Sequence, residues 1–476
     1  MTEHDYDEES ETELAIIGAG PAGYVAAIRA GQLGMDVTLV ERDGFGGTCL
    51  NHGCIPSKAL IHAADVAESA RTADDIGIYT DVDVNFDEIQ RWKDRIVRRL
   101  TKGVEKLCTS NGVNLLEGEA TFAGSDAVVV RNRDGDRTRV SFDDAIVATG
   151  SRPIEIPGLE YDGESILDSK AVLGMEELPE DLVVIGAGYI GMELSMALAK
   201  LGVSVTVVEE LDGILPTYDD DLVRPVESQA AELGIEFEFG KRAVDGTIDD
   251  DGSVTLQLSA PDEPAAEPES VTSEKVLVAV GREPVTDSLE LENAGVSVDS
   301  RGFIETTDGF RTEQENVYAV GDVAGEPLLA HAGSEEGKLV AESIAGSEPV
   351  QSIETIPAAV FTDPEIATVG LSESEAADRG YDPVVGSYSF RVNGRALTAD
   401  SANGAITIVA DESTGRILGG QIVGDTASEL IAEVGLAVAN ELTVADLVNT
   451  VHSHPTLSEG IVEAALDTEG AGIHML

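Results

Sequence analysis

The sequence predicts an α/β protein in which two Rossmann-like dinucleotide-binding domains are followed by a smaller α+β domain. Two glycine-rich turns indicate the nucleotide domains, because each follows a short apolar run and precedes a helix-compatible stretch. The third domain is indicated by a change of pattern near residue 357, after which strand-like runs alternate with two predicted helices, 372–380 and 428–440. At 476 residues the chain is also longer than one hydrophobic core usually supports.

The first glycine-rich turn reads GAGPAG and follows a predicted strand at residues 13–17. Glycine at Gly18, Gly20 and Gly23 allows the backbone to approach a pyrophosphate at the N-terminus of the next helix. Glu41 ends the following strand, where a carboxylate can bind the ribose hydroxyls of the nucleotide. Strand, turn, helix and terminal acid together predict a dinucleotide site.

The same unit recurs in register, at an offset of 168 residues. It supplies Gly186, Gly188 and Gly191, and its second strand ends at Glu209. One copy could be vestigial, but both copies keep their glycines and their terminal acid. Two intact copies imply that one chain holds two different nucleotides.

The second copy also predicts which nicotinamide cofactor is used. An acid at the strand end pairs with a free ribose 2′-hydroxyl, whereas a 2′-phosphate needs a nearby Arg or Lys. Glu209 and Glu210 end the strand, and the next basic residue along the chain is Arg224. The pattern therefore favours NAD over NADP.

Other predicted strands end in small-residue turns. Residues 145–148 end at Thr149 and Gly150, and residues 276–280 end at Gly281; such turns suit a chain that passes between domains. Residues 244–272 predict a hairpin with an acidic surface loop around Pro261-Asp262-Glu263-Pro264, which carries no evident chemistry.

A strand at 317–320 is followed by Gly321 and Asp322. An acid directly after the terminal glycine of a strand can accept hydrogen bonds from the polyol of a flavin. The next predicted helix, 328–344, includes Ala330 in its first turn. Its N-terminus could stabilise a reduced flavin anion.

Two of the three cysteines, Cys49 and Cys54, lie five positions apart in a glycine-rich stretch. We expect a tight loop here, with a helix over residues 55–64 whose N-terminus favours thiolate over thiol. Such a pair suits thiol–disulfide exchange, although two small buried cysteines brought together by chance are the alternative. A helix is predicted over residues 85–107. The third cysteine, Cys108, follows Arg98-Arg99-Leu100 on a predicted helix, and we expect it to be structural.

A second chemical cluster lies near the C-terminus, where His454 is followed five residues later by Glu459. Imidazole is the side chain best suited to take a proton from a thiol near neutral pH, and an acid can orient it. The alternative is that His452 and His454 are satisfied surface histidines in a proline turn. No further Cys or His cluster lies nearby, so we expect no metal site.

The chain has 90 acidic and 30 basic residues, a formal net charge of −60 spread along its length. Molar salt, in which the Debye length is about 3 Å, removes most of the resulting self-repulsion. The composition resembles that of proteins from extreme halophiles. Nucleic acid and anionic membranes are unfavourable partners for such a surface. With an acidic N-terminus and no apolar run near 20 residues, we expect a cytoplasmic protein.

These motifs resemble those of the flavin-dependent pyridine nucleotide–disulfide oxidoreductases over essentially the full length. The match rests on residues 46–58, both fingerprints, Gly321-Asp322 and residues 454–459. Within the family, Ser57 and Leu457 resemble the members that act on lipoamide rather than glutathione. The C-terminus also lacks the vicinal cysteine pair of mercuric reductases. The departures are the acidic surface and an aromatic residue, Tyr189, where an aliphatic one is common.

The resemblance implies a division of the chain and a homodimer. The FAD-binding domain would comprise 1–156 and 282–350, the NAD-binding domain 157–281, and the dimerisation domain 351–476. His454 and Glu459 would then reach the cysteines of the partner subunit.

The resemblance also implies roles for residues. Cys49 would be the interchange thiol, Cys54 the charge-transfer thiolate facing the flavin, and Lys58 would pair with Glu193. The implied FAD-binding residues are Gly18, Gly20, Gly23, Glu41, Gly47, Thr48, Lys58, Thr149, Gly150, Gly321, Asp322 and Ala330. The implied NAD-binding residues are Gly186, Gly188, Gly191, Glu193, Glu209 and Gly281.

The implied reaction is the oxidation of protein-bound dihydrolipoyl groups by NAD⁺. The partner would be the lipoylated carrier protein of a 2-oxoacid dehydrogenase or glycine-cleavage system. One alternative is a reductase of another small disulfide, which the NAD preference disfavours. Another is a catalytically silent flavoprotein subunit of a dehydrogenase assembly, which the intact cysteine and histidine sets disfavour.

Overall fold

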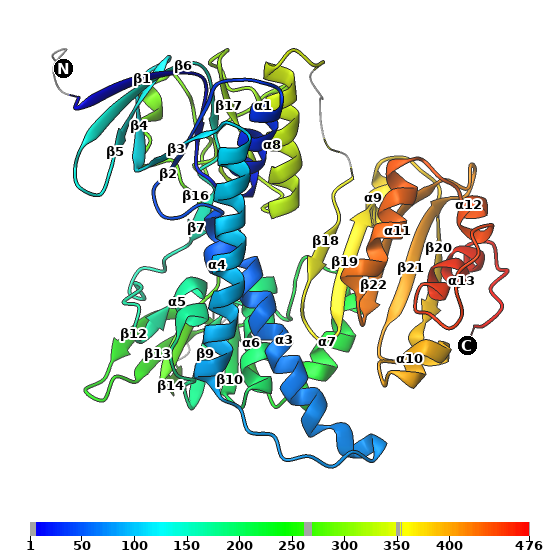
Figure 1. Cartoon of the computed structure of the whole chain (residues 1–476). Coiled ribbons are helices and arrows are strands. Elements are labelled where there is room, and N and C mark those ends of the chain that lie inside the picture. Colours follow the sequence, from blue (N-terminus) through cyan, green and yellow to red (C-terminus); the bar gives the residue numbers. More distant parts are fainter. Residues whose placement is uncertain (1–5, 261–268, 349–352, 354, 476) are drawn as a thin grey trace.

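The computed structural model describes residues 6–260, 269–348, 353 and 355–475. Figure 1 shows three packed regions, with the N-terminal sheet at the top, a second sheet below it and the C-terminal region to the right. The acidic loop predicted around Pro261 and Pro264 lies outside the described residues.

The first sheet has the strand order β3-β2-β1-β6-β5-β4, and β17 adds in parallel to β6. Its central pairs are parallel, and β5 joins β4 and β6 in antiparallel fashion. Its strands are β1 (Glu8–Ile17), β2 (Val37–Glu41), β3 (Asn114–Glu117), β4 (Glu119–Gly124), β5 (Ala127–Arg131), β6 (Arg137–Val147) and β17 (Val317–Ala319).

Three long helices accompany this sheet: α1 (Pro21–Gln32), α4 (Phe86–Ser110) and α8 (Ala330–Ile344). A fourth, α3 (Cys54–Arg71), buries Leu60, Ala64 and Ala67 in the core of the second sheet. A Cβ at Gly337 of α8 would lie 2.3 Å from the Ala22 carbonyl oxygen. Glycine is therefore needed where α8 packs against α1. The predicted helix at 85–107 corresponds to α4, which Asn85 caps by accepting from the Glu88 N–H.

The second sheet has the parallel order β11-β10-β9-β15-β8. Its strands are β8 (Ile166–Leu167), β9 (Asp181–Ile185), β10 (Ser204–Glu209), β11 (Glu236–Phe239) and β15 (Lys275–Val278). The helices are α5 (Ser169–Gly174), α6 (Tyr189–Lys200) and α7 (Asp220–Glu232). An antiparallel sheet of β12 (Arg242–Ile248), β13 (Val254–Ser259) and β14 (Glu269–Ser273) replaces the simple hairpin predicted at 244–272.

The chain passes between the two sheets at β7 (Ser151–Pro153) and β16 (Arg282–Pro284), which pair antiparallel. These strands directly follow Gly150 and Gly281, the two turns predicted to return the chain between domains. Both glycines have positive φ, 68° and 131°. The prediction is confirmed.

The C-terminal region is an antiparallel sheet, ordered β18-β19-β22-β21-β20. Its strands are β18 (Ala358–Val360), β19 (Glu365–Gly370), β20 (Pro383–Ser389), β21 (Ala405–Asp411) and β22 (Ile417–Gly424). The described helices are α9 (Glu373–Asp378), α10 (Gly394–Thr398), α11 (Ala427–Ala439), α12 (Val444–Val448) and α13 (Glu459–Asp467). The sequence predicts α9 and α11 alone; α10 and α12 are single turns, and α13 is a short apolar segment whose periodicity gives a weak signal.

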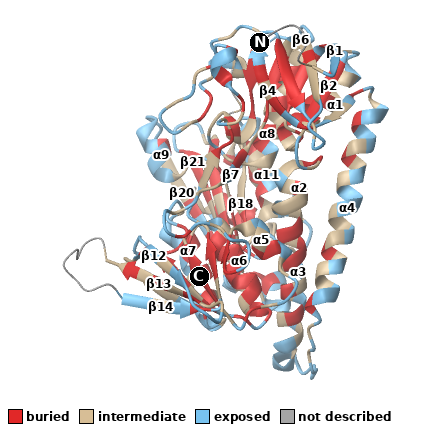
Figure 2. Cartoon of the chain, turned by 90° about the vertical axis from the view of Figure 1, so that its left-hand side faces the viewer, coloured by how far each residue is buried: buried red, intermediate tan, exposed pale blue. Residues whose placement is uncertain are grey.

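Strands of both nucleotide-binding sheets are buried at the centre, as Figure 2 shows. Leu14, Ile16, Val184 and Leu277 have no exposed surface, as expected for parallel strands covered on both faces. No helix within the described ranges combines the length and apolar character needed to span a membrane.

A buried lysine joins the three regions. Lys200 of α6 is 4% exposed, and its Nζ lies 2.6 Å from Asp65 of α3 and 2.7 Å from Asp363 before β19. Burial opposes its charge, but the two aspartates raise the pKa of Lys200. The ion triad therefore holds α3 and α6 together at the C-terminal region.

We expect Lys200→Ala to lower the free energy of unfolding by about 1–3 kcal/mol, because it leaves two aspartates facing each other beside a buried site. Lys200→Met, which keeps the apolar stem, should lose nearly as much. Urea unfolding in molar KCl measures both. Lys338→Ala is the matched control, since its pair with Glu335 is a surface pair of similar length, 2.6 Å. If all three variants lose the same small amount of unfolding free energy, the ion triad stabilises the protein no more than a surface ion pair does.

Candidate active site

A cavity of about 450 Å³ lies where the first and second sheets meet. Eleven of the twelve residues predicted to bind FAD line it: Gly18, Gly20, Glu41, Gly47, Thr48, Lys58, Thr149, Gly150, Gly321, Asp322 and Ala330. The exception is Gly23. Both Cys49 and Cys54 also line this cavity, so the cysteines and the first nucleotide turn belong to one site.

The three glycines of the first turn have different structural roles. A Cβ at Gly18, which has φ 100°, would lie 2.3 Å from the Ala148 carbonyl oxygen. A Cβ at Gly23 would lie 1.8 Å from the Gly18 carbonyl oxygen, so Gly23 serves packing and not the cavity. A Cβ at Gly20 would have no neighbouring atom within 4 Å, and Gly20 faces the cavity at the start of α1. This is the one position of the three that leaves room for a phosphate.

The second turn repeats this geometry. A Cβ at Gly186 (φ 103°) would lie 2.5 Å from the Ala279 carbonyl oxygen, and one at Gly191 would lie 2.1 Å from the Gly186 carbonyl oxygen. A Cβ at Gly188, at the start of α6, would again have nothing within 4 Å. The two copies therefore match in backbone packing as well as in sequence, which argues against a vestigial copy.

The terminal acids also match. Glu41 accepts the Ala19 N–H at 2.7 Å, and Glu209 accepts the equivalent Ala187 N–H at 2.8 Å. Their second oxygens accept backbone N–H groups just beyond each strand, from Asp43 at 2.8 Å and Leu211 at 2.9 Å. Each acid thus braces its own glycine turn at the position where ribose hydroxyls would lie.

The sequence reasoning missed a cation beside the second acid. Arg242 of β12 forms a two-nitrogen ion pair with Glu210, and Lys241 next to it pairs with Glu238 and Glu269. The backbone of Lys241 also donates to the Glu209 carbonyl at 3.0 Å. Basic residues are therefore close to the strand end, but each is neutralised by a carboxylate, which is consistent with the predicted preference for NAD.

The cysteine stretch is more helical than expected. Gly47–His52 forms a short helix, α2, that carries Cys49, and Cys54 is the first residue of α3. The predicted loop is thus wrong between residues 47 and 52. The physical reason is Asn51, whose side-chain amide donates to the carbonyls of Gly44, Phe45 and Gly47 at 3.0 to 3.3 Å and so holds the preceding turn against α2.

Both cysteines are free thiols; Cys54 is exposed toward the cavity and Cys49 is half-buried. A hydrogen bond from Cys49 is the largest influence on Cys54 and, together with Lys58, it lowers the pKa of Cys54 to about 7 against the opposing effect of burial. The same contact, with burial, raises the pKa of Cys49. Above about pH 7 the pair therefore carries one proton, on Cys49, and Cys54 is mainly the thiolate.

Lys58 is held by a buried acid from the second nucleotide unit. Its Nζ lies 2.7 Å from Glu193 of α6, which is 4% exposed, and 4.4 Å from the centre of the Phe361 ring. The other oxygen of Glu193 accepts the Phe361 N–H at 2.8 Å. Glu193, predicted with the NAD residues, therefore lies at the Lys58 side of the cavity, whereas Gly281 lies at the crossing between domains.

Asp322 belongs to a network that the sequence did not indicate. Ser151 donates to its carboxylate at 2.5 Å, and Arg282 donates to the Ser151 hydroxyl at 2.8 Å. The neighbouring Gly321 N–H is accepted by Glu336 of α8 at 2.7 Å. These polar contacts fix Gly321 and Asp322 between β17 and α8.

Tyr189, the aromatic residue that departs from the family pattern, is the first residue of α6 and faces the same cavity. Burial raises the pKa of Tyr189 to about 12, so its hydroxyl stays protonated near neutral pH.

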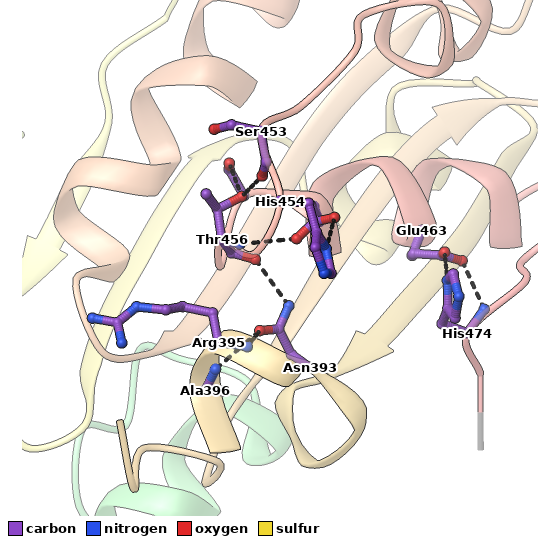
Figure 3. Close-up of polar contacts among 10 residues, drawn as sticks. Asn393, Arg395, Ala396, Ser453, His454, Thr456, Glu463 and His474 are labelled. Carbon is purple, nitrogen blue, oxygen red and sulfur yellow. Dashed lines mark hydrogen bonds and ion pairs between the residues drawn. The ribbon is translucent and has the colours of Figure 1, made fainter. Parts of the chain in front are cut away.

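At the C-terminus, His454 Nδ1 lies 2.9 Å from Glu459, the first residue of α13. Burial acts to raise the pKa of Glu459, but hydrogen bonds from the Thr456 N–H and the His454 ring hold it below its usual value. The carboxylate is thus an acceptor, so Nδ1 carries the proton and Nε2 is free to accept one. Figure 3 shows this contact, with Asn393 donating to the Thr456 carbonyl beside it.

His452 is different. Its Nε2 bonds Glu433 at 2.7 Å, its Nδ1 bonds the Thr450 carbonyl, and its side chain is only 9% exposed. It is the satisfied structural histidine of the two. The His454 side chain is 80% exposed and does not line the cavity. Within one chain the structure therefore brings together the cysteines, Lys58 and Glu193, but not the histidine.

Cys108 is fully buried, and burial raises its pKa to about 11, as expected of a structural thiol. In the part of the chain that the structure describes, no group of three His, Cys, Asp or Glu residues is arranged to hold a metal ion.

Two family models match this chain. The pyridine nucleotide-disulphide oxidoreductase model covers residues 12–337, and the dimerisation-domain model of the same family covers residues 356–465. The chain is 55% identical to a dihydrolipoyl dehydrogenase of Halobacterium salinarum, over 99% of both chains. It is 43% identical to the dihydrolipoyl dehydrogenase of Geobacillus stearothermophilus, over 98% of both.

Solved structures agree with this match. The crystal structure of LpdA from Mycobacterium tuberculosis superposes with a TM-score of 0.89 at 29% identity and covers 96% of this chain and 99% of that one. The HOCl-induced flavoprotein disulfide reductase RclA from Escherichia coli superposes with a TM-score of 0.83 at 25% identity and covers 95% and 99%.

A pair of substitutions at Cys49 tests the electrostatics of the thiol pair. Cys49→Ser keeps a donor to Cys54, whereas Cys49→Ala removes it, so we expect a higher pKa for Cys54 in the Ala variant than in the Ser variant. The pH profile of iodoacetamide alkylation of the reduced protein measures this, and a double variant with Cys54→Ser identifies the titrating group. Coincident profiles in the two variants would contradict the assignment of Cys54 as the thiolate.

Proposed function

Because the chain belongs to the pyridine nucleotide-disulphide oxidoreductase family, we propose that it is a dihydrolipoyl dehydrogenase that oxidises protein-bound dihydrolipoyl groups and reduces NAD⁺. The observation that carries the proposal is the cysteine pair, with its lowered Cys54 pKa, beside the Lys58–Glu193 ion pair. The pair lies in a cavity lined by the first glycine turn and by the first turns of α6. Relatives that carry this enzyme name match over nearly the whole length.

The residues of the cavity fit FAD. Gly20 leaves an open approach at the N-terminus of α1, where a pyrophosphate is favoured, and Glu41 lies at the position for ribose hydroxyls. Asp322 would receive the ribityl hydroxyls, and Lys58 would lie beside the ring. NAD would be held by Gly188 at the N-terminus of α6 and by Glu209.

The dimerisation-domain match supports a homodimer. In the proposed dimer, His454 of the partner subunit faces the cysteine pair, which explains why the most exposed catalytic candidate lies outside the cavity of its own chain. Glu459 orients the ring and stabilises its positive charge.

The chemistry then follows from the residues. In the oxidised enzyme Cys49 and Cys54 form a disulfide. One dihydrolipoyl thiol gives its proton to His454 Nε2, and its sulfur attacks Cys49, so that Cys54 leaves as the thiolate that its lowered pKa favours. The second dihydrolipoyl thiol then attacks the first sulfur, which closes the lipoyl disulfide and releases Cys49. Cys49 takes up the proton that this second thiol loses, while His454 keeps the first proton. FAD, when bound, supplies the two-electron chemistry that links the reduced cysteine pair to NAD⁺.

The direct test is NAD⁺ reduction by dihydrolipoamide in molar KCl, followed by the absorbance of NADH. We expect turnover with NAD⁺ and at least ~10-fold less with NADP⁺, because Glu209 and Glu210 face the 2′ position without a free cation. Small thiol disulfides with NADPH serve as the comparison. Faster turnover of those than of dihydrolipoamide would replace the proposal with a disulfide reductase.

His454→Gln should lower kcat for dihydrolipoamide oxidation by at least ~10²-fold, the usual effect of losing a general base. His474→Gln is the matched control, since His474 is also an exposed histidine paired with a glutamate of α13, Glu463, at 2.7 Å (Figure 3). That control should keep near-normal activity. Equal losses in both variants would point to disruption of α13, and a normal rate in His454→Gln would exclude it as the base.

A further inference from the structure

Helix α4 carries an unusual concentration of positive charge. Its 25 residues hold seven of the chain's 30 basic residues, against four acidic ones. At about 100° per residue, every position between 91 and 106 that falls in one roughly 100° arc of the helix is basic. The arc consists of Arg91, Arg95, Arg98, Arg99, Lys102 and Lys106. We call these six residues the α4 stripe.

All six residues of the α4 stripe are exposed. Figure 2 shows α4 along the outside of the molecule, with exposed segments on its length. Among the residues described by the structure, Arg91 pairs with Asp87, and no ion pair is found for the other five. Elsewhere in the described part of the chain about half of the basic residues form ion pairs with carboxylates, whereas five of the six on this surface form none.

Helix α4 contacts the helix that carries Cys49 through a residue beside the α4 stripe. Thr101 of α4 donates to the side-chain oxygen of Asn51 at 3.2 Å, and Asn51 is the clamp of helix α2, which carries Cys49. In sequence Thr101 lies between Arg99 and Lys102. Arg99 and Lys102 therefore lie within one helical turn of the point where α4 touches α2, on an adjacent face of α4.

We propose that the α4 stripe is the docking surface for an acidic, lipoyl-bearing carrier protein. The inference rests on the proposed function, since it names the partner from which the dithiol arrives. A carrier soluble in the same salt needs an acidic surface for the same reason as this chain. At a Debye length of about 3 Å, long-range steering is screened, so the stripe acts through contact pairs with carboxylates near the lipoyl lysine.

Charge and position favour this occupant over two others. The dimerisation-domain match covers residues 356–465, and α4 lies outside that span. Because the proposed dimer also brings the partner's His454 to Cys49, the oligomeric state of the stripe variant decides between the carrier and a second copy. Nucleic acid would have to approach past a surface of net charge −60, and its phosphate contacts weaken steeply with salt.

The test compares three reduced substrates: free dihydrolipoamide, a dihydrolipoyl-lysine peptide flanked by Asp and Glu, and the same peptide flanked by Asn and Gln. The variant combines Arg95→Gln, Arg98→Gln and Arg99→Gln. The control combines Arg131→Gln, Arg301→Gln and Arg379→Gln, three exposed arginines outside α4, of which Arg301 forms ion pairs with Asp299 and Glu326. Assays use the lowest KCl concentration at which all proteins remain flavin-loaded dimers.

We expect the stripe variant to lose at least ~10-fold in kcat/KM for the acidic peptide only, with the other two substrates within about twofold of the unsubstituted enzyme. The control should behave like the unsubstituted enzyme with all three. A uniform loss, or no loss, overturns the inference while leaving the proposed function intact. Absence of dihydrolipoamide turnover in the unsubstituted enzyme would instead overturn the proposed function and the inference with it.

Two further outcomes also overturn it. If sedimentation shows that the stripe variant is monomeric, the α4 stripe is part of the interface with a second copy of the chain. Loss of binding to a single-stranded poly-U RNA, with peptide kinetics unchanged, would make it a nucleic-acid surface.

Discussion

The ion pair between Lys58 and Glu193 is the contact on which the geometry of the site depends. It joins α3, whose first residue is Cys54, to α6, which begins at the second glycine turn, and the same carboxylate accepts a backbone N–H from Phe361 in the C-terminal region. One buried carboxylate thus links all three sheets beside the redox pair. Removing either partner would leave an uncompensated charge in a nearly buried position, which is far more costly than the pair itself is stabilising.

The duplicated nucleotide unit shows how one packing solution serves two sites. In each copy, two glycines are required because a Cβ would overlap a carbonyl, one glycine leaves space at a helix N-terminus, and one acid braces the turn. The copies differ in what lies around them. The first faces the cysteines, whereas the second places Glu210 against Arg242. The choice between the two nucleotides therefore depends on the residues around each turn, because these residues differ between the copies while the turns themselves match.

The balance of charge on α4 is opposite to that on the rest of the surface. Over most of the surface carboxylates are in excess, and about half of the few cations, Lys241 and Arg242 among them, are bound by neighbouring acids. Along α4 the balance is reversed on one exposed arc. At molar salt only charges in contact interact strongly, so unpaired cations on an acidic protein matter chiefly where another acidic surface comes to rest on them.

The sequence by itself determined the fold class, the two glycine turns with their acids, and the Lys58–Glu193 pair through family resemblance; local spacing carries this information because strands, turns and helices obey short-range periodicities. It misjudged the segment 47–52 as loop, because the helix there depends on Asn51 reaching three carbonyls of the preceding turn. It could not find Arg242 beside Glu210, since 32 residues separate them and only strand β12 brings them together. The tertiary structure also decided that His452 is bound by Glu433 while His454 turns to solvent, away from its own cysteines. Such long-range contacts depend on how helices and strands pack in three dimensions, and no local periodicity of the sequence predicts them.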